Sequence, residues 1–170
     1  KFHYTDLNGN KVVDYTEDEE GNREIFHYFP GNMYSEYTNA SGILERHYYN
    51  DRYLETKIEY PDNSFAAMTY DDRNNLISYR DQLGQVSQYG YDQNRNLIQV
   101  VDPEGNVESW SYNEFNTISS HTDKMGNITN FIYDSKGNLI SVKYPDGSAV
   151  NYTYNNRGQM FEETDQLLNK

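Results

Sequence analysis

The feature that most limits how this chain can fold is an internal repeat of 21 residues. Repeats of about 20–50 residues are typical of solenoids and arrays, in which each unit packs mainly against its neighbours. One column of the repeat is tyrosine throughout, at Tyr28, Tyr49, Tyr70, Tyr91, Tyr112, Tyr133 and Tyr154.

A second column of the repeat indicates turns. Glycine and asparagine both tolerate the positive φ angles that tight turns require. The unit that follows Tyr133 contains a turn at 133–138, a strand at 139–143, a second turn at 144–147 and a strand at 149–154. The turn column comprises Gly21, Gly42, Asn63, Gly84, Gly105, Gly126 and Gly147.

We therefore predict an all-β fold of about eight β-hairpin repeats, joined into one twisted, curved antiparallel ribbon. Gly, Asn and Asp interrupt the chain every 8–12 residues or so, which excludes helices of useful length. A single domain is expected over residues 1–170. Its units step by 21 residues from about residue 28 to residue 165, after a longer first unit at 4–27.

Further columns predict ladders of side chains along the ribbon. One row, two residues before the tyrosines, includes Trp110 and Phe131, and another row includes His121 and Val142. Aromatic and β-branched neighbours on adjacent strands contribute roughly 0.2–1 kcal/mol per pair. A bulge between Val107 and Trp110 is expected, since it would place Val107, Trp110 and Tyr112 on one face.

Composition sets the classes of protein that the chain can belong to. A hydrophobic content of 35% and a net charge of −13 lie close to the range of disordered chains, but 18 tyrosines supply large, stiff rings for a core. The absence of cysteine excludes disulfides, thiolate zinc sites and a cysteine nucleophile. The negative charge disfavours nucleic acid as a partner, and no apolar run is long enough for membrane insertion.

The motif Tyr-Asp-x-x-Gly-Asn-Leu at 133–139, together with Asp-Pro-x-Gly at 102–105, resembles the YD repeat of the RHS family. The resemblance extends from about Tyr4 to Asp165 and weakens after Tyr28 and Tyr49, where the units are expected to deviate from the regular hairpin. It implies a wall segment of a spiral β-shell, as in bacterial toxin shells and teneurins, within a larger secreted or cell-surface protein.

The resemblance implies a non-catalytic, structural role for the segment in a bacterial protein. Its partner is then the remainder of the parent polypeptide. Two alternatives stay open: a carbohydrate-binding or adhesin module that uses an exposed aromatic face, and a toxin-delivery shell that encloses a cargo polypeptide. Open sheet edges also favour an edge-to-edge homodimer.

No catalytic, cofactor or metal site is predicted. The four histidines lack metal-ligand spacing, and His47 and His121 stand in ladder columns. The segments at 6–10 and 92–96 match the opening Asp-x-Asn-x-Asn of a calcium loop, but the same residues are favoured in hairpin turns.

Aromatic residues outside the tyrosine columns are the candidates for ligand contact. Aromatic rings that remain exposed on one face of an open ribbon often mark a binding surface. The candidates are Tyr48, Tyr53 and Phe115.

Overall fold

The computed structural model describes residues 1–166, which form strands and a single short 3-10 helix, η1 (Pro30–Asn32). The prediction of an all-β fold is therefore confirmed. No helix in this part of the chain is long and apolar enough to cross a membrane. The strands are β1 (Phe2–Leu7), β2 (Asn10–Glu17), β3 (Arg23–Phe29), β4 (Tyr34–Thr38), β5 (Leu44–Tyr49), β6 (Glu55–Glu59), β7 (Phe65–Tyr70), β8 (Leu76–Arg80), β9 (Val86–Tyr91), β10 (Leu97–Val101), β11 (Val107–Tyr112), β12 (Ile118–Thr122), β13 (Ile128–Tyr133), β14 (Leu139–Lys143), β15 (Ala149–Tyr154) and β16 (Met160–Gln166).

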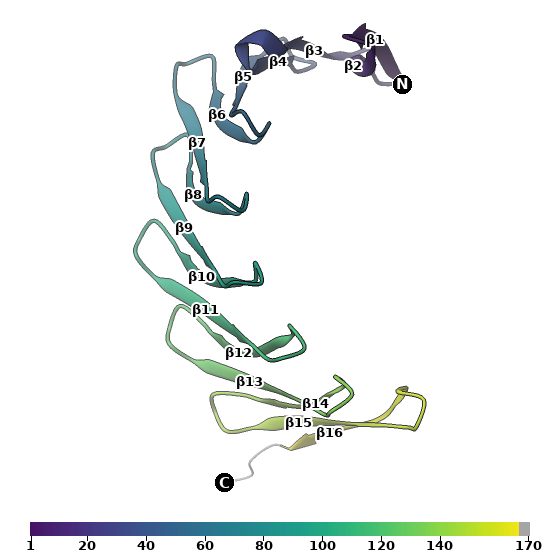
Figure 1. Ribbon diagram of the computed structural model, residues 1–170, viewed down its shortest axis with the longest axis vertical. Helices are drawn as coiled ribbons and strands as arrows, with labels where there is room; N and C mark the ends of the chain where they lie inside the picture. Colours follow the sequence, from purple (N-terminus) through teal and green to yellow (C-terminus); the bar gives the residue numbers. More distant parts are fainter. Residues whose placement is uncertain (167–170) are drawn as a thin grey trace. The chain divides into compact units, whose positions relative to one another are not determined.

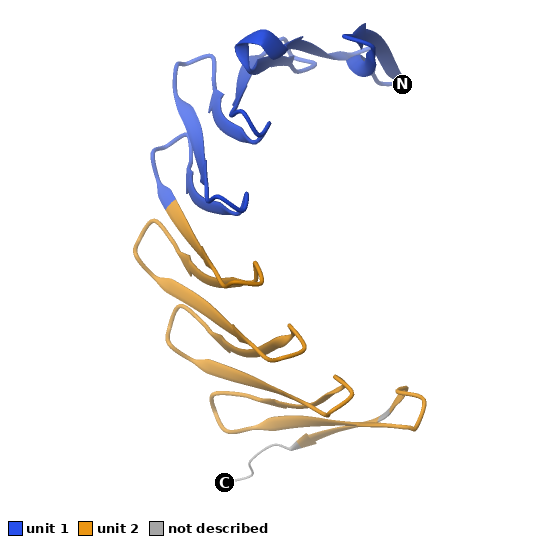
Figure 2. Ribbon diagram, viewed as in Figure 1, with its two compact units in different colours: residues 1–86 blue, residues 87–170 orange. Residues whose placement is uncertain are grey.

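The strands form one sheet in chain order, β1 to β16, and the hairpins are antiparallel (Figure 1). This order confirms the predicted antiparallel hairpin ribbon. The chain divides into two compact units, residues 1–86 and 87–170 (Figure 2). The single domain over 1–170 stays a prediction, and its last residues, 167–170, lie outside the described part of the chain.

The two turns of each repeat share one backbone geometry. At 102–106 the Asp102 amide donates to the carbonyl of Asn106 at 3.0 Å, and the Gly105 amide donates to the carbonyl of Asp102 at 3.0 Å. The Asp102 carboxylate also accepts a bond from the Asn106 amide at 2.8 Å, as Asp does in Asx turns. The same pair of backbone bonds closes the turn at 134–138. Each such turn holds its fourth residue at positive φ, at Gly21, Gly42, Tyr53, Asn63, Asn74, Gly84, Arg95, Gly105, Asn116, Gly126, Gly137, Gly147 and Gly158.

A β-bulge recurs next to the tyrosine column. The pairing of β11 with β12 shifts between Ser111 and Tyr112, which leaves Ser119 as an extra residue on β12. The register of β11 is continuous from Val107 to Ser111. The predicted bulge between Val107 and Trp110 is therefore wrong, and Val107 lies on the face opposite Trp110 because side chains alternate along a continuous strand.

One face of the sheet carries rows of large side chains that pair across individual hairpins. The predicted row that includes Trp110 and the predicted row that includes His121 lie on alternate strands. Their members therefore stand directly opposite each other within a hairpin. His121, for example, stacks on Trp110 with ring centroids 5.3 Å apart. The directly opposed pairs are Phe26–Tyr37, His47–Ile58, Met68–Tyr79, Tyr89–Val100, Trp110–His121 and Phe131–Val142.

The core of this single-layer sheet is small. Within residues 1–166 the buried hydrophobic side chains are Ala66, Met68 and Val142, and two of these belong to the ladder. The opposite face is more open, since Val107 is 42% exposed there. Cross-strand pairs along one face therefore supply most of the apolar burial that stabilises the sheet.

Candidate functional site

Tyrosines of the repeat column tie a hairpin to the one before it in the regular part of the chain. The Tyr112 hydroxyl donates a hydrogen bond to the carbonyl oxygen of Leu97, 15 residues earlier, at 2.9 Å. The paired residues of β10 and β11 begin at Gln99, so the Leu97 carbonyl lies beyond that ladder. The hydroxyl thus satisfies a backbone acceptor at the point where the two strands separate. The bond recurs from Tyr70 to Glu55, Tyr133 to Ile118 and Tyr154 to Leu139.

The regular pattern changes at the N-terminal units. Tyr28 is followed by the η1 turn instead of the regular hairpin, as the sequence predicts. The unit after Tyr49 was also expected to deviate from the regular hairpin, and for its backbone this is wrong. The turn at 50–54 keeps both backbone hydrogen bonds of the regular turn. The Tyr49 hydroxyl differs from its equivalents, however, since it bonds the Ser35 hydroxyl at 3.1 Å.

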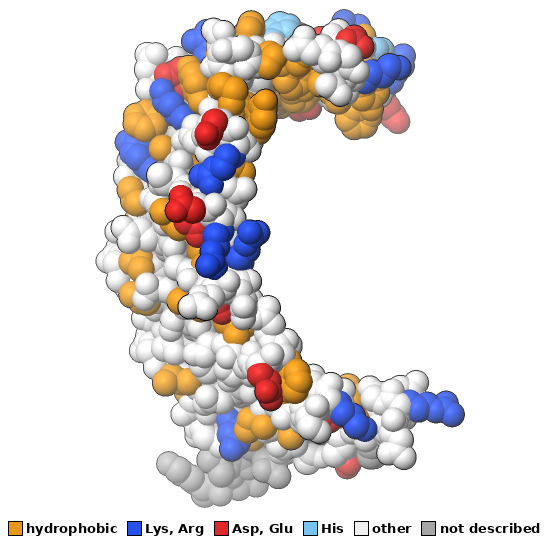
Figure 3. All heavy atoms as spheres, in the orientation of Figure 1, with side chains coloured by type: hydrophobic (Ala, Val, Ile, Leu, Met, Phe, Trp, Pro, Cys, Tyr) orange, Lys and Arg blue, Asp and Glu red, His pale blue; other side chains and the backbone are white. Residues whose placement is uncertain are grey.

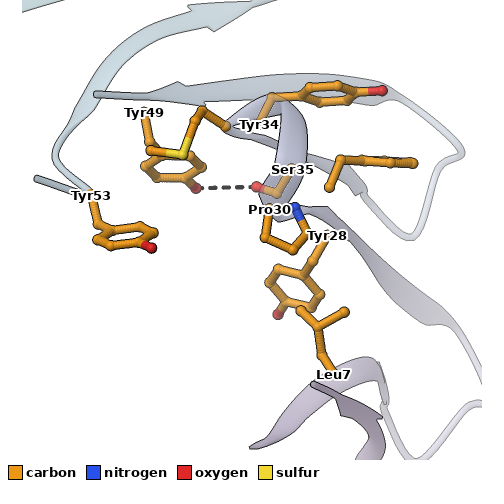
Figure 4. A pocket seen from close by; sticks show the side chains of 9 residues that line it. Leu7, Tyr28, Pro30, Tyr34, Ser35, Tyr49 and Tyr53 are labelled. Carbon is orange, nitrogen blue, oxygen red and sulfur yellow. Dashed lines mark hydrogen bonds between the residues drawn. The ribbon is translucent and has the colours of Figure 1, made fainter. Parts of the chain in front are cut away.

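An aromatic pocket of about 270 Å³ lies beside the η1 turn, in the unit of residues 1–86. Figure 4 shows the rings of Tyr28, Tyr49 and Tyr53 around it. Hydrophobic side chains also gather over the N-terminal strands in Figure 3. We define the aromatic pocket by its lining residues, Leu7, Tyr28, Phe29, Pro30, Met33, Tyr34, Ser35, Tyr49 and Tyr53.

The 3-10 turn creates this pocket. Pro30 stands in the first turn of η1, where its fixed φ suits a helical start. Met33 ends η1 at a φ of 55° and accepts a hydrogen bond from the Tyr49 amide at 2.8 Å through its carbonyl. The sequence signal is the Phe-Pro-Gly-Asn segment at 29–32, which marks a break in the repeat but does not predict a pocket.

Tyr53 occupies an unusual backbone position. It stands in the column of residues with positive φ, where the next four repeats carry Asn74, Arg95, Asn116 and Gly137. Its φ is 58°, a region that bulky residues rarely adopt. The side chain is 76% exposed and lines the aromatic pocket. An exposed aromatic ring is thus held at a site where glycine is favoured.

Replacing Tyr53 with glycine is expected to raise the free energy of unfolding. Glycine has no Cβ to clash in the left-handed region, which relieves about 1–2 kcal/mol of strain, and its added freedom in the unfolded chain offsets roughly 0.5–1 kcal/mol of this gain. The net gain is about 0.5–1 kcal/mol, measurable by urea denaturation. A loss of stability in Tyr53→Gly would show that the ring contributes more through packing than its backbone costs.

The other two candidate contacts lie apart from the pocket. Tyr48 donates a hydrogen bond to Glu59 at 2.8 Å, and the Lys57 ammonium lies 5.2 Å from its ring centroid. Phe115 is 47% exposed in the turn at 113–117, in the other compact unit. Of the three predicted ligand contacts, only Tyr53 lines the aromatic pocket.

His47 lies in the ladder between two carboxylates. Its Nδ1 is 2.5 Å from an oxygen of Glu55, and its Nε2 is 3.6 Å from an oxygen of Glu45. The hydrogen bond to Glu55 raises the pKa of His47 above its ordinary value of 6.5. The protonated form therefore stabilises the folded chain more than the unfolded chain.

Stability is accordingly expected to fall with rising pH. The contribution of His47 is complete below the unfolded pKa of 6.5 and is lost as the pH rises through the higher folded value. Urea unfolding between about pH 5 and about pH 8 measures this slope. His47→Gln and Glu55→Gln should both flatten it; an unchanged slope in both variants would assign the pH dependence to other groups.

The two segments that resemble calcium loops use their carboxylates within the turn. The Asp92 carboxylate accepts bonds from the amides of Asn94 and Asn96 and from the Asn96 side chain, at 2.8–2.9 Å. Within residues 1–166, no group of three or more His, Asp or Glu side chains is placed to hold a metal ion.

These features define a tandem β-hairpin protein in which tyrosine hydroxyls link successive hairpins. A family model described as RHS Repeat matches residues 70–107 and 133–165. These two segments are therefore RHS repeats, and the resemblance predicted from the sequence is confirmed. The matched model describes a structural repeat and not a catalytic family.

Two solved structures that share this fold are much longer than this chain. A structure titled as TcdB2-TccC3 without its hypervariable C-terminal region is 14% identical, with a TM-score of 0.68, and the match covers 91% of this chain and 10% of that chain. The Tc holotoxin pore of Photorhabdus luminescens, with a mutation in TccC3, is 14% identical, with a TM-score of 0.58 and coverages of 89% and 9%. The chain thus spans about a tenth of each solved chain. No curated protein matches it in sequence.

Proposed function

We propose that the chain is a non-catalytic wall segment of an RHS-type β-shell within a larger secreted or cell-surface protein. The observation that carries this proposal is the repeated bond from a tyrosine hydroxyl to the carbonyl 15 residues earlier. The bond fixes the spacing between consecutive hairpins at the same point of these four units, as a regular wall requires.

The solved structures support the same function. One solved chain with this fold belongs to the Tc holotoxin pore of Photorhabdus luminescens and another to TcdB2-TccC3, and this chain matches about a tenth of each. The proposal includes an extracellular toxin context, a larger parent polypeptide and an enclosed cargo. The single domain over 1–170 and a bacterial source belong to it as well.

A carbohydrate-binding face is the weaker alternative. Tyr48 is bonded to Glu59, and Phe115 belongs to the compact unit that does not contain Tyr53. Tyr48 is also half-buried, so the structure gives no grounds for combining the three rings into one sugar-binding surface.

Hydrogen exchange at the edge strand tests the wall proposal. Strand β1 pairs only with β2, so amides on its other side are open in the 170-residue chain. In the complete parent polypeptide a preceding hairpin should pair with β1 and slow exchange of these amides by about tenfold or more. The amides of β11, paired on both sides, serve as the internal control.

Equal exchange at β1 in the chain and in the parent would contradict the wall proposal. Protection that appears in the isolated chain only at high protein concentration would instead indicate the edge-to-edge homodimer.

A further inference from the structure

We propose that the aromatic pocket binds a single neutral aromatic ring. The site lies outside the tyrosine–carbonyl bonds on which the wall function rests, so it adds a binding activity to a structural segment. Nothing in the regular repeat requires a pocket at this point, because the standard turn is replaced here by η1.

The size of the pocket suits one ring. Its volume of about 270 Å³ is at the lower limit of ligand sites, which are typically about 300–1,000 Å³. Rings of Tyr28, Tyr49 and Tyr53 line it from different elements (Figure 4). A bound ring can therefore make offset or edge-to-face contacts, which aromatic pairs prefer.

The chemistry of the lining favours a neutral and largely apolar ligand. None of the nine lining residues carries a charge, although the chain as a whole has a net charge of −13. The polar groups are Ser35 and tyrosine hydroxyls, and the Ser35 and Tyr49 hydroxyls already bond each other at 3.1 Å. A sugar would bury several hydroxyls with few partners, and unsatisfied polar groups are costly.

Tyr53 presents an exposed ring to the pocket from a strained backbone position. Its ring is held at the pocket by a backbone conformation with φ of 58°, in a column where the next repeats carry Asn74, Arg95, Asn116 and Gly137. Strained backbone of this kind tends to occur at functional sites, where the surrounding structure maintains it. Tyr53 is 76% exposed, so little of its surface packs against the described residues of the chain.

Ligand-detected NMR and calorimetric titration of the 170-residue chain test the inference. The probes are 4-methylphenol, N-acetyltyrosinamide and methyl α-glucoside. The two aromatic probes should bind with a dissociation constant of about 1 mM or below, as expected for small ligands of this size, and the glucoside should not bind. Tighter binding of N-acetyltyrosinamide would identify a polypeptide side chain as the source of the ring, and tighter binding of 4-methylphenol a small molecule.

Matched variants separate binding from folding. Tyr53→Gly should fold at least as stably as the original chain and lose about tenfold or more in affinity, whereas Tyr53→Phe should retain affinity within about twofold. Arg95→Gly relieves the same backbone conformation in a turn that does not line the pocket and should leave binding unchanged. Absence of binding by both aromatic probes, binding of the glucoside in their place, or equal binding by Tyr53→Gly would overturn the proposal.

Discussion

Replacing Tyr112 with alanine is expected to lower the free energy of unfolding by about 3 kcal/mol or more, the usual cost of truncating a large aromatic side chain in a core. The change removes the ring from the ladder face. It also removes the hydroxyl that satisfies the Leu97 carbonyl at 2.9 Å. Urea denaturation monitored by circular dichroism measures the loss.

Two further variants divide this effect into its parts. Tyr112→Phe keeps the ring and leaves the Leu97 carbonyl without its partner, at an expected cost of about 1 kcal/mol. Tyr144 is 42% exposed in a turn outside the column, so Tyr144→Ala should cost less than about 1 kcal/mol. Equal losses in Tyr112→Ala and Tyr144→Ala would mean that the tyrosine column has no special structural role.

The second large effect is expected at the glycines of the turns. Gly126 has a φ of 83°, and a Cβ added there would meet no atom within 4 Å. Any cost of Gly126→Ala therefore comes from the backbone alone and should be about 1–2 kcal/mol.

Gly31 provides the matched control for this substitution. A Cβ added at Gly31 also meets nothing within 4 Å, but the residue does not adopt positive φ. Gly31→Ala should then be neutral or stabilise the chain by up to about 1 kcal/mol. Equal destabilisation by both substitutions would contradict the assignment of the cost to the left-handed backbone.

The turns and ladders of this fold were predictable because their causes are local. Gly105 and Gly126 stand where the turn requires positive φ, and Asp102 and Asp123 at the start of these two turns accept bonds from the backbone four residues on. The side-chain rows follow from the alternation of strand residues. Because the sequence repeats every 21 residues, the structure predicted for one unit also applies to the next.

The features that the sequence did not reveal depend on register between strands. The bulge lies beside Tyr112 instead of between Val107 and Trp110, because it is set by the extra residue at Ser119 on the partner strand. The bond from Tyr112 to Leu97 joins residues 15 positions apart and becomes visible only when the strands are paired. The spacing of residues within one strand predicts neither the position of the bulge nor this hydrogen bond.

The candidate site was predicted only in part. Tyr53 was identified as an exposed aromatic residue, but its positive φ and its place beside Tyr28 and Tyr49 come from the structure. Met33 and Pro30 gave no separate signal, since their contribution depends on the η1 turn. Tyr48 and Phe115 were identified on the same grounds as Tyr53 and lie outside the pocket.

Cryo-electron microscopy of the complete parent polypeptide tests the central claim most directly. The proposed function predicts a closed, hollow β-shell in which the strands of residues 1–166 form a continuous part of the wall, with hairpins paired on both of their open edges. A parent in which the segment forms a free stalk, with the edges of β1 and β16 exposed to solvent, would contradict the assignment of this chain as shell wall.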